Sequence, residues 1–150
     1  MVPWVMALMT AAMFQFDGLV NIVALEAGRD SCFALDREGF IWAWGSNEYG
    51  QLGKGTEPSG TSGRLGNNTP QKITVPAGLP AIKKLSFGFG QVVAIDVKGE
   101  VWNWGSNVKD GYASEAKRSG TPLKVDGLSN VIDVAGCFDY GLAVTADGDV

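Results

Sequence analysis

The chain has 150 residues, of which 45% are hydrophobic and 19% are charged, so it is long enough for one domain with a buried core. Its net charge is −4 and its pI is about 4.7, which excludes binding of nucleic acid or an anionic membrane through a basic patch. The sequence contains no histidine, and its two cysteines, Cys32 and Cys137, form no CxxC motif. Composition therefore predicts no enzyme, no metal site and no cofactor.

The first sixteen residues, MVPWVMALMTAAMFQF, are apolar and carry no charged side chain. A signal peptide would need a basic start and an A-x-A cleavage site, and a transmembrane helix would need ~20 apolar residues. We favour a third interpretation of 1–16. Phe14-Gln15-Phe16 stands before Asp17-Gly18-Leu19 as Leu123-Lys124-Val125 stands before Asp126-Gly127-Leu128, which indicates the last strand of a preceding repeat. The sequence leaves the compartment open, with the cytoplasm slightly favoured over secretion.

From Asp17 onward the chain is built from repeats. Each copy opens on a Gly-Leu pair and has a second glycine at a fixed distance from the first. The opening glycines are Gly18, Gly78 and Gly127, and the later glycines are Gly39, Gly99 and Gly148. Between them lie two apolar runs, of which the second, CFAL, VVAI or GLAV, has alanine at the same position in every copy. A small residue at a repeated position predicts the close approach of a neighbouring sheet.

The second apolar run leads through a tight loop, DREG, DVKG or TADG, into the next segment. These loops predict hairpins that close on a glycine with a left-handed backbone. In the first two copies the next segment carries two tryptophans, Trp42 and Trp44 or Trp102 and Trp104, which lie on one face of an extended chain. We expect them to pack in the core. A fourth, weaker strand is predicted in PQKITV and in TPLKV.

The stretch AGRDSCFALDREGFIWAWGSNEYGQLGKG, residues 27–55, resembles the repeats of the regulator of chromosome condensation family. The shared features are the [LI]-D-x-x-G hairpin, the W-x-W-G-S-N strand end and G-Q-L-G, which the second copy replaces by VKDGYASEAKRSG. The histidine typical of these repeats is replaced by Ser31, Gln91 and Tyr140. The resemblance covers residues 17–150, as repeats 17–76, 77–125 and an incomplete 126–150.

This resemblance implies an all-β chain that forms a partial β-propeller, with about seven blades of four strands in the complete ring. Each blade of a propeller buries its faces against its neighbours, so the ring depends on its closure. We therefore expect the chain to be a piece of a longer protein.

One set of candidate site residues follows from the repeat. The loop after the first strand of each copy carries aromatic or charged side chains, and equivalent loops of a propeller emerge on one face. The residues are Arg29, Asp30, Phe89, Phe138 and Asp139. Aromatic residues and arginine anchor protein interfaces, which predicts a protein-binding patch. The alternative is that the rings fold down over the next blade and only fill space.

The function predicted from the sequence is a non-catalytic scaffold for protein–protein interaction. The alternative, implied by the family's founding members, is guanine-nucleotide exchange on a small GTPase. The expected partner is a protein, with a small GTPase as one candidate, and neither nucleic acid nor a membrane is expected to bind.

Overall fold

The computed structural model describes residues 6–9, 12–28, 30–55, 67–74, 76–106, 118–137 and 140–150, and the regular structure in these ranges is β-strand. The first blade is the sheet β3 (Ile22–Ala27), β4 (Ser31–Asp36), β5 (Ile41–Gly45) and β6 (Asn67–Lys72), in that order. The second is β7 (Ile82–Phe87), β8 (Gln91–Asp96), β9 (Val101–Gly105) and β10 (Ser119–Lys124). The all-β class is thus confirmed. No helix long and apolar enough to cross a membrane occurs in the described ranges.

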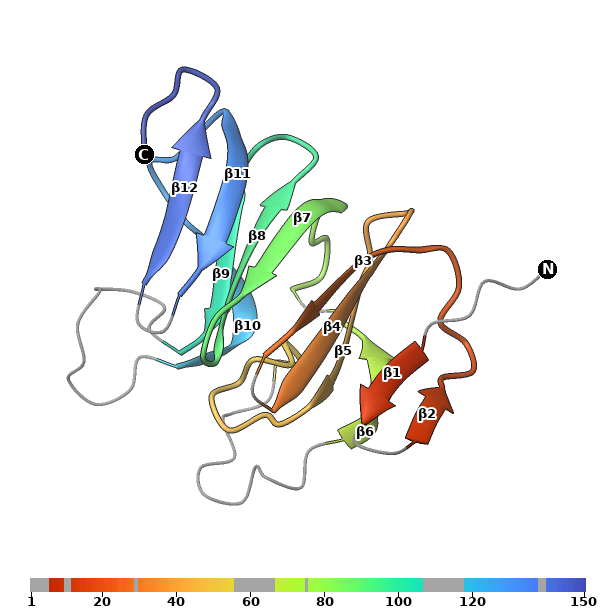
Figure 1. Cartoon of the computed structure of the whole chain (residues 1–150). Coiled ribbons are helices and arrows are strands. Elements are labelled where there is room, and N and C mark those ends of the chain that lie inside the picture. Colours follow the sequence, from red (N-terminus) through yellow and green to blue (C-terminus); the bar gives the residue numbers. More distant parts are fainter. Residues whose placement is uncertain are drawn as a thin grey trace.

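Two shorter sheets flank the blades. The strands β11 (Val131–Gly136) and β12 (Gly141–Thr145) form an antiparallel pair beside blade 2, and Figure 1 shows these sheets fanned face to face as in a propeller. The strands β1 (Met6–Met9) and β2 (Ala12–Gln15) pair with each other before blade 1. Just after β2, the ring of Phe16 lies 5.3 Å from that of Trp44. The assignment of residues 1–16 to the end of a preceding repeat stays a prediction.

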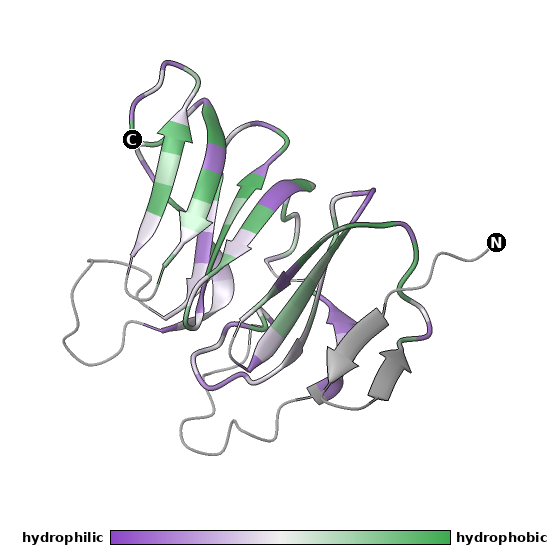
Figure 2. Cartoon of the chain, in the orientation of Figure 1, coloured by the Kyte–Doolittle hydropathy of each residue, from purple (hydrophilic) through white to green (hydrophobic). Residues whose placement is uncertain are grey.

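Buried side chains join neighbouring sheets, because the middle strands of each blade are apolar on both faces. The cluster between the two blades includes Phe33, Leu35 and Ile41 from the first and Ile82, Leu85, Val92 and Trp104 from the second. A second cluster joins Val93, Ile95 and Val101 to Val131 and Val134 of β11. Figure 2 shows the apolar residues concentrated in these stacked strands.

The tryptophan strands follow the predicted alternation. Trp44 packs with Phe16 on one side of blade 1, whereas Ile41 and Ala43 join the cluster on the other side. Trp44 is 8% exposed and Trp104 is 0% exposed, so both rings belong to the core as expected. Both strands end at the predicted glycines, Gly45 and Gly105.

The fourth strands differ from the expectation in their limits. β6 and β10 begin before the segments PQKITV and TPLKV and end before Ile73 and Val125. The amides of Ile73 and Val125 still donate to the carbonyl oxygens of Ile41 and Val101, each at 2.8 Å. Each strand also contains a proline, Pro70 or Pro122, on an outer edge where the lack of an N–H hinders the addition of another strand.

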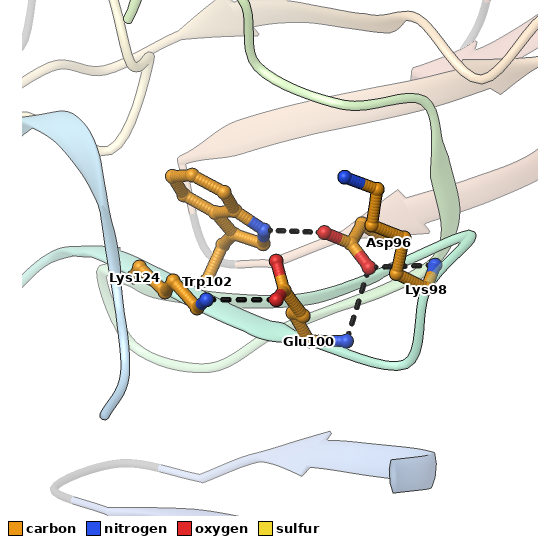
Figure 3. A network of polar contacts seen from close by, with 5 residues as sticks. All are labelled: Asp96, Lys98, Glu100, Trp102 and Lys124. Atoms are coloured by element: carbon orange, nitrogen blue, oxygen red, sulfur yellow. Dashed lines mark hydrogen bonds and ion pairs between the residues drawn. The ribbon is translucent and has the colours of Figure 1, made fainter. Parts of the chain in front are cut away.

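An aspartate at the end of the second strand fixes each complete hairpin. One oxygen of Asp96 accepts hydrogen bonds from the amides of Lys98 (2.8 Å) and Glu100 (3.0 Å), and the other accepts one from the Trp102 indole (3.0 Å), as Figure 3 shows. Asp36 accepts the equivalent three bonds in blade 1. Burial alone would raise the pKa of Asp96, but these bonds and the Lys98 charge favour the carboxylate and lower its pKa overall.

We expect Asp96→Asn to lower stability by roughly 1–3 kcal/mol at neutral pH, because bonds to a buried charged group are lost or weakened. The folded pKa lies below that of the unfolded chain, about 3.9. The ionised carboxylate therefore stabilises the fold above about pH 4, and this contribution is lost as the pH falls through the folded pKa. Urea midpoints at neutral and acidic pH should show a smaller acid-induced loss in the variant than in the wild type. Asp126→Asn, at an exposed corner, is the control, and equal acid losses in the wild type and Asp96→Asn would contradict this role.

Candidate protein-binding face

The β3–β4 and β7–β8 loops, two of the loops that the sequence singled out, lie at one end of the sheets, toward the bottom of Figure 1, and the hairpins lie at the other end. The β3–β4 loop and the segment after β5 leave blade 1 at this end, and the β7–β8 loop leaves blade 2 there. Between the blades they line a cleft. Its lining residues are Asp30, Ser46, Glu48, Tyr49, Gln51, Phe87, Phe89 and Gly90.

Two of the predicted site residues, Asp30 and Phe89, are therefore brought together in one cleft. Asp30 is exposed, and Phe89 is partly buried. The other three, Arg29, Phe138 and Asp139, lie outside the described residues. The role of all five in binding stays a prediction.

The segment from Ser46 to Gly55 is an ordered turn because its own side chains bond its backbone. The Asn47 side-chain oxygen accepts from the Leu52 amide (3.0 Å), and the Gln51 side-chain oxygen accepts from the Tyr49 amide (2.8 Å). Leu52 is thereby placed in the core between the blades, with 2% of its surface exposed. The G-Q-L-G motif thus gives this loop a fixed shape.

The same turn binds both to its own blade and to the next one. The Ser31 hydroxyl donates to the Ser46 carbonyl (2.9 Å) and accepts from the Gln51 side-chain amide (3.2 Å). The Gln51 carbonyl accepts a bond from the Trp104 indole of blade 2 (2.9 Å). Ser31, which replaces the family's histidine, therefore helps to anchor the turn that links the two blades.

Two aromatic rings from adjacent blades meet at this end. The ring of Tyr49 lies 5.9 Å from that of Phe89, and the Arg118 guanidinium lies 4.8 Å from the Tyr49 ring centre. A side chain at Gly90 would place its Cβ 2.6 Å from the Tyr49 ring, so glycine there allows the ring to cross to blade 2. Arg118 also donates to the Glu48 carbonyl at 3.3 Å. We call Asp30, Glu48, Tyr49, Phe89 and Arg118 the loop-face cluster.

Sequence reasoning missed Tyr49 and Arg118. Tyr49 lies directly before G-Q-L-G, and the sequence pattern assigns it no role, although tyrosine is enriched at protein interfaces. Arg118 follows a segment that differs between the copies, so no repeat position located it. The cluster offers rings, a cation and carboxylates for binding. In the described part of the chain, no group of three or more cysteine, aspartate or glutamate side chains is placed to hold a metal ion.

Comparison with known proteins points to one family. The model of the regulator of chromosome condensation (RCC1) repeat matches residues 38–95, and a second model of the same repeat matches 22–51. The human E3 ubiquitin-protein ligase HERC2 is 32% identical over 132 residues, which cover 85% of this chain and 2% of that protein. The human regulator of chromosome condensation is 28% identical over 134 residues, covering 87% of this chain and 30% of that protein.

Protein pim1 of Schizosaccharomyces pombe is 33% identical over 148 residues, covering 88% of this chain and 27% of that protein. The chain thus spans less than a third of the length of these relatives.

Solved structures agree on the fold. Human WBSCR16 superposes with a TM-score of 0.73 at 21% identity, covering 92% of this chain and 36% of that one. Yeast RCC1 (Prp20), solved with Kap60 bound to it, superposes with a TM-score of 0.72 at 22% identity, covering 92% of this chain and 33% of that one. Prp20p of Saccharomyces cerevisiae, reported with its binding to Gsp1p and histones, superposes with a TM-score of 0.69 at 21% identity, covering 91% of this chain and 34% of that one. The repeat models, the relatives and the blades together show that the chain belongs to the RCC1-like repeat family and forms part of a β-propeller.

Proposed function

We propose that the chain is a non-catalytic scaffold that binds a partner protein through the loop-face cluster. The observation that carries this proposal is the contact of Tyr49 with Phe89 beside the Arg118 guanidinium. Tyrosine, phenylalanine and arginine are enriched at interfaces, and tyrosine and arginine are common hot spots. The three side chains come from distant parts of the sequence and meet at the rim between two blades.

The shape of the site favours a protein over a small ligand. The cleft has a volume of about 20 Å³, whereas small-molecule sites usually enclose roughly 300–1,000 Å³. The rings and the cation therefore act as a contact surface. The bonds of the turn to Ser31 and Trp104 hold this surface in place before a partner arrives, which lowers the entropic cost of binding.

The proposal is tested with purified small GTPases and histones, the classes suggested by the resemblance and by the partners reported for Prp20p. We expect Phe89→Ala and Tyr49→Ala to weaken the binding of a partner by about tenfold or more, as at interface hot spots. Val97→Ala, in the exposed hairpin of blade 2, is the apolar control and should leave the affinity unchanged. Equal affinities for folded Phe89→Ala and the wild type would contradict the assignment.

Guanine-nucleotide exchange on a small GTPase is the second candidate, favoured by the similarity to the human regulator of chromosome condensation. An exchange factor displaces the nucleotide without chemistry on it, so this function needs no acid–base residues and relies on a binding surface alone. Release of fluorescent GDP from the same GTPases discriminates the two functions. Faster release that is lost in Phe89→Ala supports exchange, and binding without faster release supports the scaffold.

A further inference from the structure

A pocket at the hairpin end of blade 1 lies opposite the loop-face cluster. Its volume is about 320 Å³, which is within the range of ligand sites, roughly 300–1,000 Å³. The described residues that line it are glycines, apolar residues, one threonine and one cation. The lining residues are Gly39, Phe40, Ile41, Lys72, Ile73, Thr74, Pro76, Gly78, Leu79 and Pro80. Ile41 and Ile73 are buried, whereas Phe40 is 40% exposed, so the pocket has an apolar floor and an accessible aromatic wall.

The two blades differ at the lysine beside this pocket. In the strand register Lys72 lies opposite Trp42 in blade 1, and Lys124 lies opposite Trp102 in blade 2. The two lysines are therefore at equivalent positions. The Lys124 ammonium lies 2.7 Å from a carboxylate oxygen of Glu100 (Figure 3). Phe40 occupies the position of Glu100 in blade 1, and the Lys72 ammonium lies 3.1 Å from its ring centre.

The Lys72 charge is therefore not neutralised by an ion pair within the described residues. A ring attracts an ammonium group but accepts no full hydrogen bond from it, whereas an ammonium group has three donors. Because Lys72 is exposed, these donors are accessible from solvent. An anion that approaches the pocket would meet a cation and an apolar surface side by side.

We propose that this pocket binds an acidic segment of a partner protein, in which a carboxylate lies next to an apolar side chain. The carboxylate pairs with Lys72, as Glu100 pairs with Lys124 in blade 2, and the apolar side chain packs on Phe40 and Leu79. Charge complementarity selects this occupant, because the only charged side chain among the described lining residues is a cation. A charge-assisted hydrogen bond is about twice as strong as a neutral one. This surface is independent of the loop-face cluster.

The test uses the full chain and two blocked hexapeptides, acetyl-Ser-Leu-Asp-Asp-Phe-Ser-amide and the same peptide with asparagine at both aspartate positions. Amide chemical shifts are followed by NMR during titration. We expect the acidic peptide to give saturable shifts at Gly39, Ile73 and Gly78. The asparagine peptide should bind at least about fivefold more weakly, because it lacks the charge-assisted bond.

Variants locate the effect. Lys72→Gln should weaken the binding of the acidic peptide about fivefold. Lys124→Gln, the matched control in blade 2, should change the affinity for this peptide less than twofold. Phe40→Glu supplies Lys72 with a carboxylate of its own, as in blade 2, and should abolish binding. Each variant is first checked for a wild-type thermal midpoint. Equal binding of both peptides, equal effects of the two lysine variants, retained binding in Phe40→Glu, or no saturable shift at the pocket would each overturn the proposal.

Discussion

Replacing Trp104 by alanine is expected to lower the free energy of unfolding by roughly 3–5 kcal/mol, the usual cost of emptying a large buried site. The ring has no exposed surface and lies in the cluster that joins the two blades. Its N–H also donates to the Gln51 carbonyl, so the alanine variant leaves both a cavity and an acceptor without its bond. Equilibrium denaturation in urea measures the loss.

Two further variants separate the causes. Trp104→Phe retains most of the apolar volume but loses the bond to Gln51, so we expect a smaller loss, roughly 1–3 kcal/mol. Trp42→Ala should also cost less than Trp104→Ala, because Trp42 is only partly buried. A loss below about 1 kcal/mol for Trp104→Ala would contradict the packing between the blades.

Gly39→Ala is expected to destabilise the fold more than Gly99→Ala, although the two glycines occupy the same hairpin position. Their φ angles are +87° and +78°, so both variants force alanine into a left-handed conformation, at about 1–2 kcal/mol each. A Cβ at Gly39 would also lie 2.6 Å from the Ala81 Cβ and 2.9 Å from its Cα. At Gly99 the nearest atom would be the Val131 oxygen at 3.4 Å.

The clash at Gly39 should add about 1–3 kcal/mol, as in overpacked cores, for a total of roughly 2–5 kcal/mol. Thermal and urea unfolding of the two variants under identical conditions give the difference directly. Because the backbone strain is common to both, the difference reports how closely the hairpin of blade 1 approaches blade 2. Equal costs would show that this approach is not tight.

The sequence predicted the parts of the fold that depend on local pattern. The two-residue spacing of Trp42 and Trp44 placed both rings on one face, because side chains of a strand alternate. The D-x-x-G loops located the hairpins, since few residues other than glycine adopt their left-handed backbone. The buried alanines Ala34 and Ala94 likewise indicated closely packed sheets.

Contacts between distant segments could not be predicted in the same way. Arg118 reaches the carbonyl of Glu48 seventy positions earlier, and the segments before it share no motif between the copies. The sequence singled out Asp30 and Phe89 but not Tyr49. Tyr49 lies beside Phe89 because hydrogen bonds within the turn that carries Tyr49 fix the shape of that turn. The limits of β6 were missed because its edge position and its proline weaken the alternation of apolar residues.

The residue limits of the sequence repeat differ from those of the sheets, and this difference matters for the exchange of blades between relatives. The RCC1 repeat model that matches 38–95 begins in the hairpin between β4 and β5 and ends within β8, so a graft with those limits would divide two sheets. The opening glycines offer better junctions. Gly18, Gly78 and Gly127 lie between sheets, and a Cβ at any of them would meet no atom within 4 Å. Recombination at these corners would transfer whole sheets and leave only their faces to be matched.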